Sequence, residues 1–255
     1  MRILEVNHVT KKFGGLTAVN NVDFYIDESE IVSLIGPNGA GKTTFFNVIT
    51  GIYEPTSGDV FFLGEKLQKS RPHQITALGI GRTFQNIRLF RSMTVLENVM
   101  TGRYVRTSSN LLATILKSPK LVREEKMSED LVISLLDFLD LSDVKDEIAT
   151  SLPYGIQRRV EIARALATEP KLLMLDEPAA GMTTGEKVEL SKLIKKIRDK
   201  GYTILLIEHD MKLVMGISDR IYVLDYGNKI AEGLPKEIQS NERVIKAYLG
   251  KGGSD

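Results

Sequence analysis

The order of apolar and polar residues changes along the chain, and each change predicts a different kind of element. Residues 3–9 (ILEVNHV) and 19–26 (VNNVDFYI) alternate with a period of two, which predicts two strands of a half-exposed antiparallel sheet. We expect a turn or loop between them at 11–15 (KKFGG) and a hairpin at 58–67. Residues 31–35 (IVSLI) are apolar throughout, as in strands that are buried on both faces.

The middle of the chain, from about 94 to 168, has a mostly helical pattern. We expect the basic stretch 117–126 to interrupt it, and a helix near 128–140 to follow. This helix has one apolar stripe at helical spacing, formed by Leu131, Leu135, Phe138 and Leu139. The simplest interpretation of the stripe is packing against the core.

Strand patterns return in the last third and alternate with helical ones. The strands are expected at 172–176 (LLMLD), 203–208 (TILLIE) and 221–227, with a polar turn and edge strand after the last. Helices are expected at 186–200 and 210–217, and the first of them should bury Val188, Leu193, Ile194 and Ile197. The last six residues, GKGGSD, are expected to fray.

Strands that alternate with helices form βαβ units around a mostly parallel sheet. We therefore predict an α/β fold with an antiparallel β subdomain near its start and an inserted α-helical subdomain. The core would comprise residues 1–90 and 166–255, and the helical subdomain residues 91–165.

Composition narrows the possible functions. Lys and Arg number 34 against 33 Asp and Glu, so the net charge of +1 gives no general attraction to nucleic acid. The absence of cysteine excludes disulfides, thiolate zinc sites and cysteine nucleophiles. Neither an apolar run of about 18 residues nor a signal-peptide pattern occurs, so we expect any membrane role to depend on a partner.

The motif GPNGAGKTT at 36–44 carries the first chemical signal. It matches G-x-x-x-x-G-K-[ST] and lies between an apolar strand and an apolar helix near 42–50. Glycines let successive backbone N–H groups surround a phosphate, and the helix N-terminus favours negative charge. Lys42 can reach the β- and γ-phosphates, and the Thr43 hydroxyl can bind Mg²⁺. The residues expected to contact nucleotide are Gly36, Pro37, Asn38, Gly39, Ala40, Gly41, Lys42, Thr43 and Thr44.

Two adjacent carboxylates end the strand LLMLD. Asp176 can hold Mg²⁺ directly or through water, and Glu177 can polarise the attacking water. Taken alone, the pair is more simply a capping turn before Pro178, but the phosphate loop upstream favours catalysis. Together the two motifs indicate a nucleoside triphosphatase with a P-loop NTPase core.

The remaining motifs resemble those of ABC-type ATPases in the same order along the chain. LPYGIQRRVEIARAL at 152–166 resembles the signature motif of this family, and AAGMTTGE at 179–186 resembles its D-loop region. Gln85 and His209 stand where the family has its Q-loop glutamine and its switch histidine, and Phe13 where an aromatic stacks on adenine.

This resemblance implies a fold and a set of roles. The fold would be a RecA-like, mostly parallel sheet. Glu177 would orient or deprotonate water, His209 would donate to the γ-phosphate, and Gln85 would sense the metal and link the site to a membrane partner. Thr43, Gln85 and Asp176 would hold Mg²⁺ beside ATP.

The signature motif departs from the family pattern. Pro153, Tyr154 and Ile156 replace the usual serine, first glycine and glutamine, and only Gly155 is retained. Pro153 offers neither a hydroxyl nor an N–H group. The N–H groups near Gly155 and Ile156 remain an anion site that would contact ATP bound to a second subunit. Arg158, Arg159 and Arg164 are expected on a solvated helix face rather than as nucleic-acid contacts.

Several stretches are similar to the ATPase subunits of branched-chain amino acid importers, among them RTFQNIRLFRSMTVLENV, DEPAAGM and IKAYLG. This resemblance implies a second ABC ATPase, identical or related, in an ATP sandwich, two membrane permeases and, indirectly, a solute-binding protein, with no nucleic acid. It places the chain on the cytoplasmic side of the cell membrane as a peripheral protein. Two alternatives remain open: the ATPase of an exporter such as that for lipopolysaccharide, and a soluble ABC ATPase without a transport role.

Overall fold

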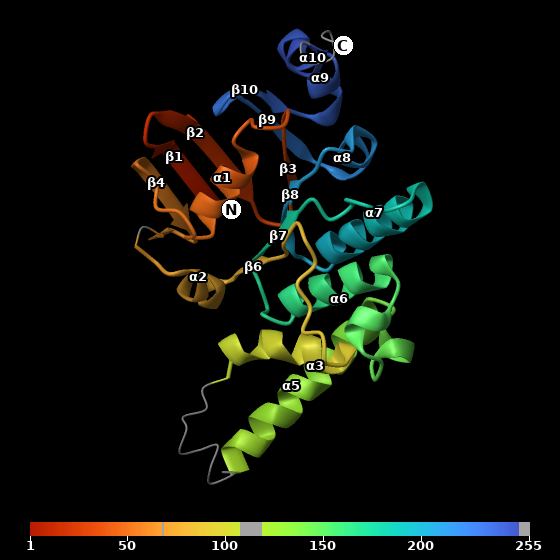
Figure 1. The fold of residues 1–255 in the computed structure, drawn as a ribbon. Coiled ribbons are helices and arrows are strands. Elements are labelled where there is room, and N and C mark those ends of the chain that lie inside the picture. Colours follow the sequence, from red (N-terminus) through yellow and green to blue (C-terminus); the bar gives the residue numbers. More distant parts are fainter. Residues whose placement is uncertain (68, 108–118, 250–255) are drawn as a thin grey trace.

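The computed structural model describes residues 1–67, 69–107 and 119–249. Two sheets and a group of helices make up the molecule, as Figure 1 shows. The six-stranded sheet has the order β10-β9-β3-β8-β7-β6, and the four-stranded antiparallel sheet has the order β2-β1-β4-β5. The α/β prediction, with a mostly parallel sheet and an antiparallel subdomain, is therefore confirmed.

The strands of the antiparallel sheet come from the first 66 residues. They are β1 (Arg2–Phe13), β2 (Leu16–Asp27), β4 (Ser57–Phe62) and β5 (Glu65–Lys66). The expected loop at 11–15 was partly wrong, because β1 continues to Phe13, which pairs with Leu16. Only two glycines are left to turn the chain, and Gly14 adopts a φ of 56°, in the region that favours glycine.

The six-stranded sheet collects segments from both ends of the chain. Its strands are β3 (Ile31–Ile35), β6 (Ile80–Arg82), β7 (Leu172–Asp176), β8 (Thr203–Ile207), β9 (Arg220–Asp225) and β10 (Asn228–Gly233). All neighbours pair in parallel except β10, which pairs antiparallel with β9 at one edge. The short strand β6 forms the other edge and was not foreseen from the pattern.

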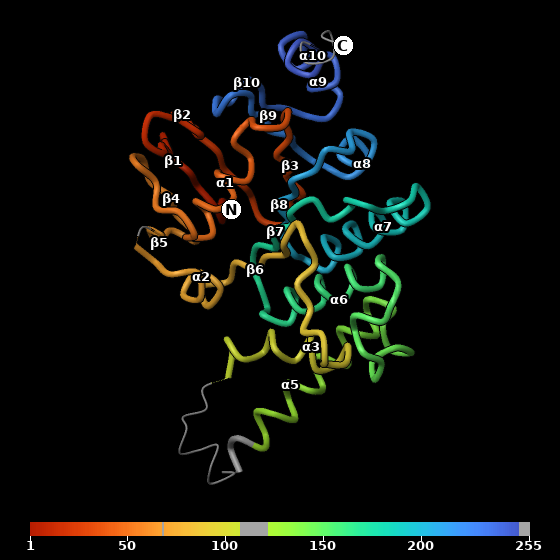
Figure 2. Tube along the Cα trace, in the orientation of Figure 1, coloured from red at the N-terminus to blue at the C-terminus, as the bar shows by residue number. Residues whose placement is uncertain are grey.

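Alternate residues of the central strands face two different cores. Leu172 and Met174 pack with the antiparallel sheet and α1 (Lys42–Ile49), while Leu173 and Leu175 pack with the helices on the opposite face. The six-stranded sheet is thus the middle layer of the molecule. Figure 2 follows the chain from the antiparallel sheet, through the helices around α3 and α5, and back into this sheet.

The helical region begins after β6 and ends before β7. Its helices are α3 (Val95–Met100), α5 (Pro119–Phe138) and α6 (Tyr154–Leu166), with short 3₁₀ turns at Thr101–Val105, Ser142–Val144 and Ala149–Ser151. The stretch expected to interrupt it at 117–126 belongs to α5 from Pro119 onward, and 117 and 118 lie outside the described residues. The division of the chain at residues 91 and 165 stays an interpretation.

The apolar stripe on α5 lies close to the expected positions. Val132, Leu136 and Leu139 are fully buried, and Leu131 and Leu135 are half-buried beside them. The stripe therefore centres one residue beyond most of the predicted positions.

Five further helices among the described residues complete the fold, and the first of them precedes the helical region. These are α2 (Pro72–Leu78), α7 (Thr184–Asp199), α8 (Met211–Ile217), α9 (Pro235–Gln239) and α10 (Glu242–Leu249). On α7, Leu193, Ile194 and Ile197 are buried as expected, but Val188 was predicted wrongly and is 49% exposed. Leu190 takes its place in the core, because the helix is rotated slightly from the predicted face.

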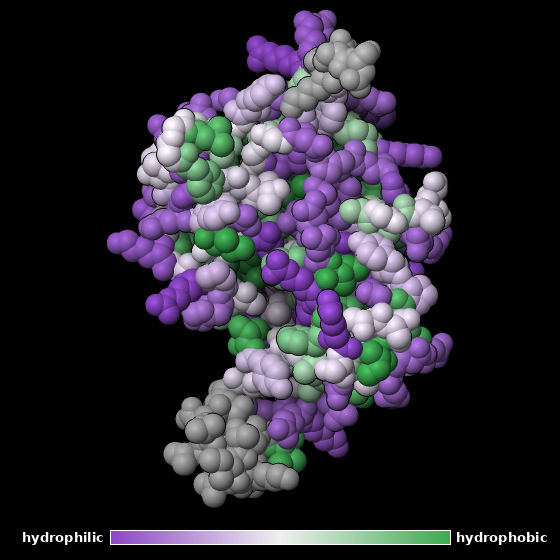
Figure 3. Space-filling model, in the orientation of Figure 1, coloured by the Kyte–Doolittle hydropathy of each residue, from purple (hydrophilic) through white to green (hydrophobic). Residues whose placement is uncertain are grey.

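No helix among the described residues is both long enough and apolar enough to cross a membrane. The face drawn in Figure 3 is mostly hydrophilic, and its hydrophobic side chains form small separate patches. The tail expected to fray, residues 250–255, lies outside the described residues.

Candidate functional site

The carboxyl ends of four parallel strands carry the residues that the sequence marks as chemical. The glycine-rich loop follows β3, Gln85 follows β6, Glu177 follows β7 and His209 follows β8. Because these strands are neighbours in the order β3-β8-β7-β6, their loops meet along one edge of the sheet. A cleft of about 470 Å³ opens there, and we call it the phosphate cleft. Its lining residues are Leu16, Thr17, Ala18, Asn38, Gly39, Ala40, Gly41, Lys42, Thr43, Thr44, Gln85, Glu177, His209, Tyr226 and Gly227.

The loop after β3 depends on glycine at two close contacts. Gly36 has a φ of 152°, and a Cβ there would overlap the carbonyl oxygen of Leu224. Gly41 has a φ of 97°, and a Cβ there would overlap the carbonyl oxygen of Ala18. Any other residue at these positions would push the loop off the neighbouring strands, so its curved path requires both glycines.

Lys42 begins α1 with its side chain folded back over the loop. Its Nζ donates hydrogen bonds to the carbonyl oxygens of Gly36 and Pro37, at 2.7 and 2.9 Å, and the residue is 5% exposed. Thr43, next on the helix, is exposed to the cleft. The loop carbonyls therefore hold the ammonium group at the N-terminal end of α1. The first N–H groups of a helix favour anions, so both features suit a phosphate at this end.

Glu177 lies between the two side chains that the sequence paired with it. The Gln85 amide donates to Glu177 Oε2 at 2.7 Å, and His209 Nε2 lies 2.6 Å from Glu177 Oε1. Both carboxylate oxygens are thus contacted by side chains from different loops. The structure brings these three predicted residues together.

The backbone at Glu177 is held in an unusual conformation. Its φ of 47° lies in the left-handed region, which costs a non-glycine residue about 1–3 kcal/mol. Its N–H donates to the Ile207 carbonyl at 2.9 Å, and this bond ties the turn to β8. Strain of this kind persists where the surroundings fix a side chain in one direction, here toward the cleft.

Asp176 lies behind the cleft, outside the residues that line it. It is 3% exposed, and its Oδ2 accepts from Arg82 Nη2 at 3.0 Å. Burial raises the pKa of Asp176, and the Arg82 guanidinium offsets part of that rise. Arg82 was not singled out in the sequence, where no local pattern joins it to a residue 94 positions away.

Glu208 is a second buried carboxylate that the sequence did not reveal. It accepts from the N–H groups of Ala179 at 2.7 Å and His209 at 3.0 Å, which joins the loop after Glu177 to the loop of His209. Burial raises the pKa of Glu208, while these N–H groups oppose the rise. Its role in the structure is to hold two loops of the cleft together.

Besides Asp176, the predicted residues Gly36, Pro37, Phe13 and Gly155 do not line the phosphate cleft. The carbonyl groups of Gly36 and Pro37 accept from Lys42 instead. Phe13 ends β1, is 41% exposed and meets the Tyr53 ring edge-on, with centroids 5.1 Å apart. Its part in adenine binding stays a prediction. Gly155 lies in the first turn of α6, where a Cβ would come within 3.0 Å of Glu186 Oε1.

The signature end, which we define as residues 152–156, has little capping of its own. Pro153 precedes α6 without a side-chain cap. The Ile156 N–H, expected to be open to an anion, instead donates to the Pro153 carbonyl at 2.9 Å. Within the described residues, the N–H groups of Tyr154 and Gly155 have no partner. These two donors, one position earlier than expected, are therefore the open ones.

The prediction of a solvated helix face was wrong for Arg158. This residue is 0% exposed, and its guanidinium donates to Glu161 Oε2 at 2.6 Å and to the Phe84 and Gln85 carbonyls at 2.8 and 2.9 Å. Glu161 Oε1 accepts from the Phe84 N–H at 3.2 Å. The signature helix therefore holds the backbone on which Gln85 stands, through a buried ion pair. Arg159 and Arg164 are half-buried.

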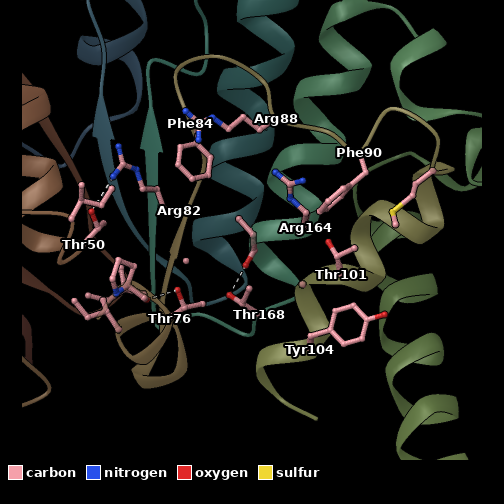
Figure 4. A pocket seen from close by; sticks show the side chains of 18 residues that line it. Thr50, Thr76, Arg82, Phe84, Arg88, Phe90, Thr101, Tyr104, Arg164 and Thr168 are labelled. Carbon is pink, nitrogen blue, oxygen red and sulfur yellow. Dashed lines mark hydrogen bonds between the residues drawn. The ribbon is translucent and has the colours of Figure 1, made fainter. Parts of the chain in front are cut away.

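A second hollow of about 690 Å³ separates β6 and α2 from the helical region, and we call it the groove. It is larger than the phosphate cleft, but it holds none of the predicted catalytic residues. Its lining combines apolar side chains with three arginines: Thr50, Ile52, Pro72, Ile75, Thr76, Ile80, Gly81, Arg82, Phe84, Arg88, Phe90, Met93, Thr101, Gly102, Tyr104, Arg164, Ala165 and Thr168. Figure 4 shows that its lining comes from β6 and α2, which carry Arg82 and Thr76, and from the helical region, which carries Thr101 and Tyr104.

Comparison with known proteins shows similarity over nearly the whole chain. The family model described as ABC transporter matches residues 19–180, and one described as branched-chain amino acid ATP-binding cassette transporter matches residues 228–254. The high-affinity branched-chain amino acid transport ATP-binding protein LivG of Salmonella typhimurium is 49% identical over 98% of both chains. A probable LivG of Archaeoglobus fulgidus is 35% identical over 98% of this chain and 96% of its own.

Solved structures agree with the sequence comparison. The ADP conformation of an ATP-binding cassette of an ABC transporter superposes with a TM-score of 0.86, at 33% identity over 98% of this chain and 99% of its own. A dimeric ATP-binding cassette bound to ADP and phosphate has a TM-score of 0.75, at 28% identity over 91% and 99% of the two chains.

Proposed function

The chain belongs to the ABC transporter family of ATP-binding proteins, and from this premise we propose that it hydrolyses ATP to drive an importer of branched-chain amino acids. The solute is inferred from relatives that are 48–49% identical over 98% of the chain and are named for branched-chain amino acid transport. The match at residues 228–254 supports the same solute class. Two permeases and a solute-binding protein would complete the importer, which places the chain at the cytoplasmic face of the membrane.

One observation carries the catalytic assignment: Glu177 is held between Gln85 and His209 at the rim of the phosphate cleft. We propose that the Glu177 carboxylate accepts a hydrogen bond, and then the proton, from the attacking water. Lys42 binds the β- and γ-phosphates, and His209 donates to the γ-phosphate as negative charge develops there. Catalysis is then mainly positioning and electrostatic stabilisation.

The donor set fits Mg²⁺, which prefers oxygen ligands and keeps several waters. Thr43, with its hydroxyl, and Gln85, with its amide oxygen, line the phosphate cleft, and Asp176 ends the strand beside it. Only Asp176 Oδ2 is engaged by Arg82, so Oδ1 is left for the metal or its water. Bound there, Mg²⁺ would neutralise charge on the phosphates during transfer.

We propose that the chain assembles with a second ATPase subunit, either a second copy of itself or a related chain. The signature end supports this assembly. The N–H groups of Tyr154 and Gly155 have no hydrogen-bond partner within the described residues. Free N–H groups at the start of a helix favour an anion. We propose that they contact ATP held in the phosphate cleft of the other subunit. The dimeric cassette among the similar structures supports this arrangement.

The groove is the proposed contact with a permease. Its apolar lining suits a helix of the partner, and Phe84 in its wall directly precedes Gln85. Because Phe84 and Gln85 are adjacent in the chain, movement of a partner segment in the groove would shift Gln85 in the phosphate cleft.

The test of the catalytic assignment is Glu177→Gln. Glutamine keeps the size and one acceptor oxygen but cannot accept a proton at neutral pH, so hydrolysis should fall by about 10²–10⁴-fold. ATP binding should persist, and the closed dimer should accumulate in gel filtration with ATP and Mg²⁺. Glu189→Gln, on an exposed glutamate of α7, is the matched control. Near wild-type hydrolysis in Glu177→Gln would contradict the assignment.

The solute is tested by reconstitution. The chain, its two permeases and a solute-binding protein in proteoliposomes should take up labelled leucine only with ATP. Uptake that fails although hydrolysis continues would contradict the solute and leave the ATPase assignment standing.

A further inference from the structure

Arg82 is buried between the groove and the metal-binding aspartate. It ends the edge strand β6, where it pairs with Met174 of β7, two residues before Asp176. Its side chain is 12% exposed, and that of Asp176 is 4% exposed. The 3.0 Å ion pair between Nη2 and Oδ2 therefore joins two charges that are largely removed from water.

The guanidinium is also fixed from the side of α1. Nη1 donates to Asn47 Oδ1 at 2.8 Å and to Thr50 Oγ1 at 2.9 Å, near the end of the helix that Lys42 begins. The Phe46 and Phe84 rings lie 4.9 and 5.3 Å from its carbon. These contacts fix the plane of the Arg82 guanidinium. Its Nη2 group therefore donates to Asp176 in one direction only.

The same side chain forms part of the groove. Figure 4 shows the Arg82 guanidinium turned toward Thr50, with Phe84 in the same cavity. The Arg88 guanidinium also lies over the Phe84 ring, with its central carbon 4.6 Å from the ring centroid. Among the groove residues that the structure describes, Arg82 alone hydrogen-bonds to Asp176.

We propose that Arg82 is a positioning residue for Asp176: it holds Oδ2 so that Oδ1 is presented to Mg²⁺, and it connects the groove to that oxygen. This inference rests on the proposed function. Two other roles compete with it. Arg82 could serve only to join β6 to β7, or it could compete with the metal for the carboxylate. The three roles predict different metal affinities.

The experiment measures Mn²⁺ affinity by electron paramagnetic resonance with a non-hydrolysable ATP analogue. Arg82→Met keeps the length of the side chain and removes the fork, so the Kd for Mn²⁺ should rise by about 10–100-fold, as for other partners of metal ligands. Arg82→Lys keeps the charge without the fork and should give a smaller rise. Arg103→Met removes an arginine that is as buried as Arg82 but pairs with Glu169 instead of Asp176, so it should leave the Kd unchanged.

Analogue binding in EDTA separates positioning from folding. It should be the same in Arg82→Met and in wild type, because the hydrogen bonds of Arg82 are with Asn47, Thr50 and Asp176, which are not among the residues proposed to bind the phosphates. If binding in EDTA falls as far as Mn²⁺ binding in both Arg82 variants, the role is structural and the proposal is wrong. Unchanged Mn²⁺ affinity would also overturn it, and tighter Mn²⁺ binding would show competition instead.

The connection to the groove has its own test. Phe84→Leu loosens the packing of the guanidinium without touching Asp176, so the Kd for Mn²⁺ should rise less than in Arg82→Met. Added to Arg82→Met, it should have no further effect, because the route through Arg82 is already broken. Additive effects would overturn this part of the proposal. Failure of wild type to bind the analogue at all would instead contradict the proposed function.

Discussion

At the phosphate cleft, side chains from separate loops hydrogen-bond one another, whereas at the signature end the first turn of α6 has no side-chain cap. Glu177 has partners on both of its oxygens, and Lys42 has two carbonyl partners. The N–H groups of Tyr154 and Gly155 have none within the described residues. Under the proposed function, one chain would thus supply most of one phosphate site and one half of another.

The two regions are nevertheless joined inside the chain. Arg158 and Glu161, one turn beyond the signature end, hold the backbone of Phe84 and Gln85. The Gln85 side chain in turn contacts Glu177. A change at the signature end therefore has a path through these hydrogen bonds to Glu177, the proposed catalytic carboxylate.

The largest expected effect comes from breaking this path. Arg158→Met leaves Glu161 as an unpaired buried charge, which should lower the free energy of unfolding by about 3–5 kcal/mol. The double variant Arg158→Met/Glu161→Leu removes both charges and should recover most of the loss. Chemical denaturation of the three proteins checks this. Equal destabilisation by the single and double variants would contradict the ion pair as the cause.

Removal of the Lys42 side chain tests the phosphate cleft. Lys42→Ala should reduce hydrolysis by roughly 10²–10³-fold, as loss of one preorganised charge does in other enzymes. Phosphate release and circular dichroism check the loss and the intact fold, with Lys66→Ala, an exposed lysine paired with Asp59, as the control. Turnover above a tenth of wild type would contradict the phosphate role.

Pro153→Ser tests the incomplete side. A serine adds one hydroxyl, so ATP-dependent dimer formation should be preserved or raised, by about tenfold or more for one hydrogen bond to a charged phosphate of about 1.5–3 kcal/mol. If Pro153 instead fixes the start of α6, the variant should melt lower with no gain in dimer. Analytical ultracentrifugation beside a melting curve separates these results. A stable variant with a weaker dimer would contradict both explanations.

The smallest effect is expected between α7 and the loop of His209. Lys187 donates to Asp210 Oδ2 at 2.8 Å, and this bond lowers the pKa of Asp210 below its usual value. A lowered carboxyl pKa stabilises the fold above the unfolded pKa, and this stability is lost as pH falls through the folded pKa. Asp210→Asn keeps the cap on α8 but loses the ion pair, so its melting temperature should lie slightly below wild type at pH 7.

The difference should shrink as the pH falls below about 4, the ordinary pKa of an aspartate, because the unfolded chain then takes up a proton before the folded protein does. Melting curves across this range check the sign. A gap that widens at low pH would show that the ion pair is not the source of the stability.

The local pattern was enough to predict the main strands, the glycine-rich loop and the residue types of the phosphate cleft. Runs such as IVSLI and LLMLD are buried whichever neighbours they have, and the loop motif carries its own glycines and lysine. The roles of Gln85 and His209 came from the family resemblance, and their meeting with Glu177 depends on strand ends that share one edge, including that of the unforeseen β6. Their catalytic roles stay predictions.

Only the tertiary structure decided which charges lose their water. Arg82 and Asp176 are 94 positions apart, and Arg158 and Phe84 are 74 apart, so no spacing rule connects them. The strand order puts β6 beside β7 and α6 over the loop that follows β6, and this arrangement buries arginines that look like surface residues in the sequence. Burial makes each such charge depend on one partner, because a lone charge inside a protein is costly. The sequence therefore determined the chemistry available to this protein, and the packing of its layers determined which side chains hold that chemistry in place.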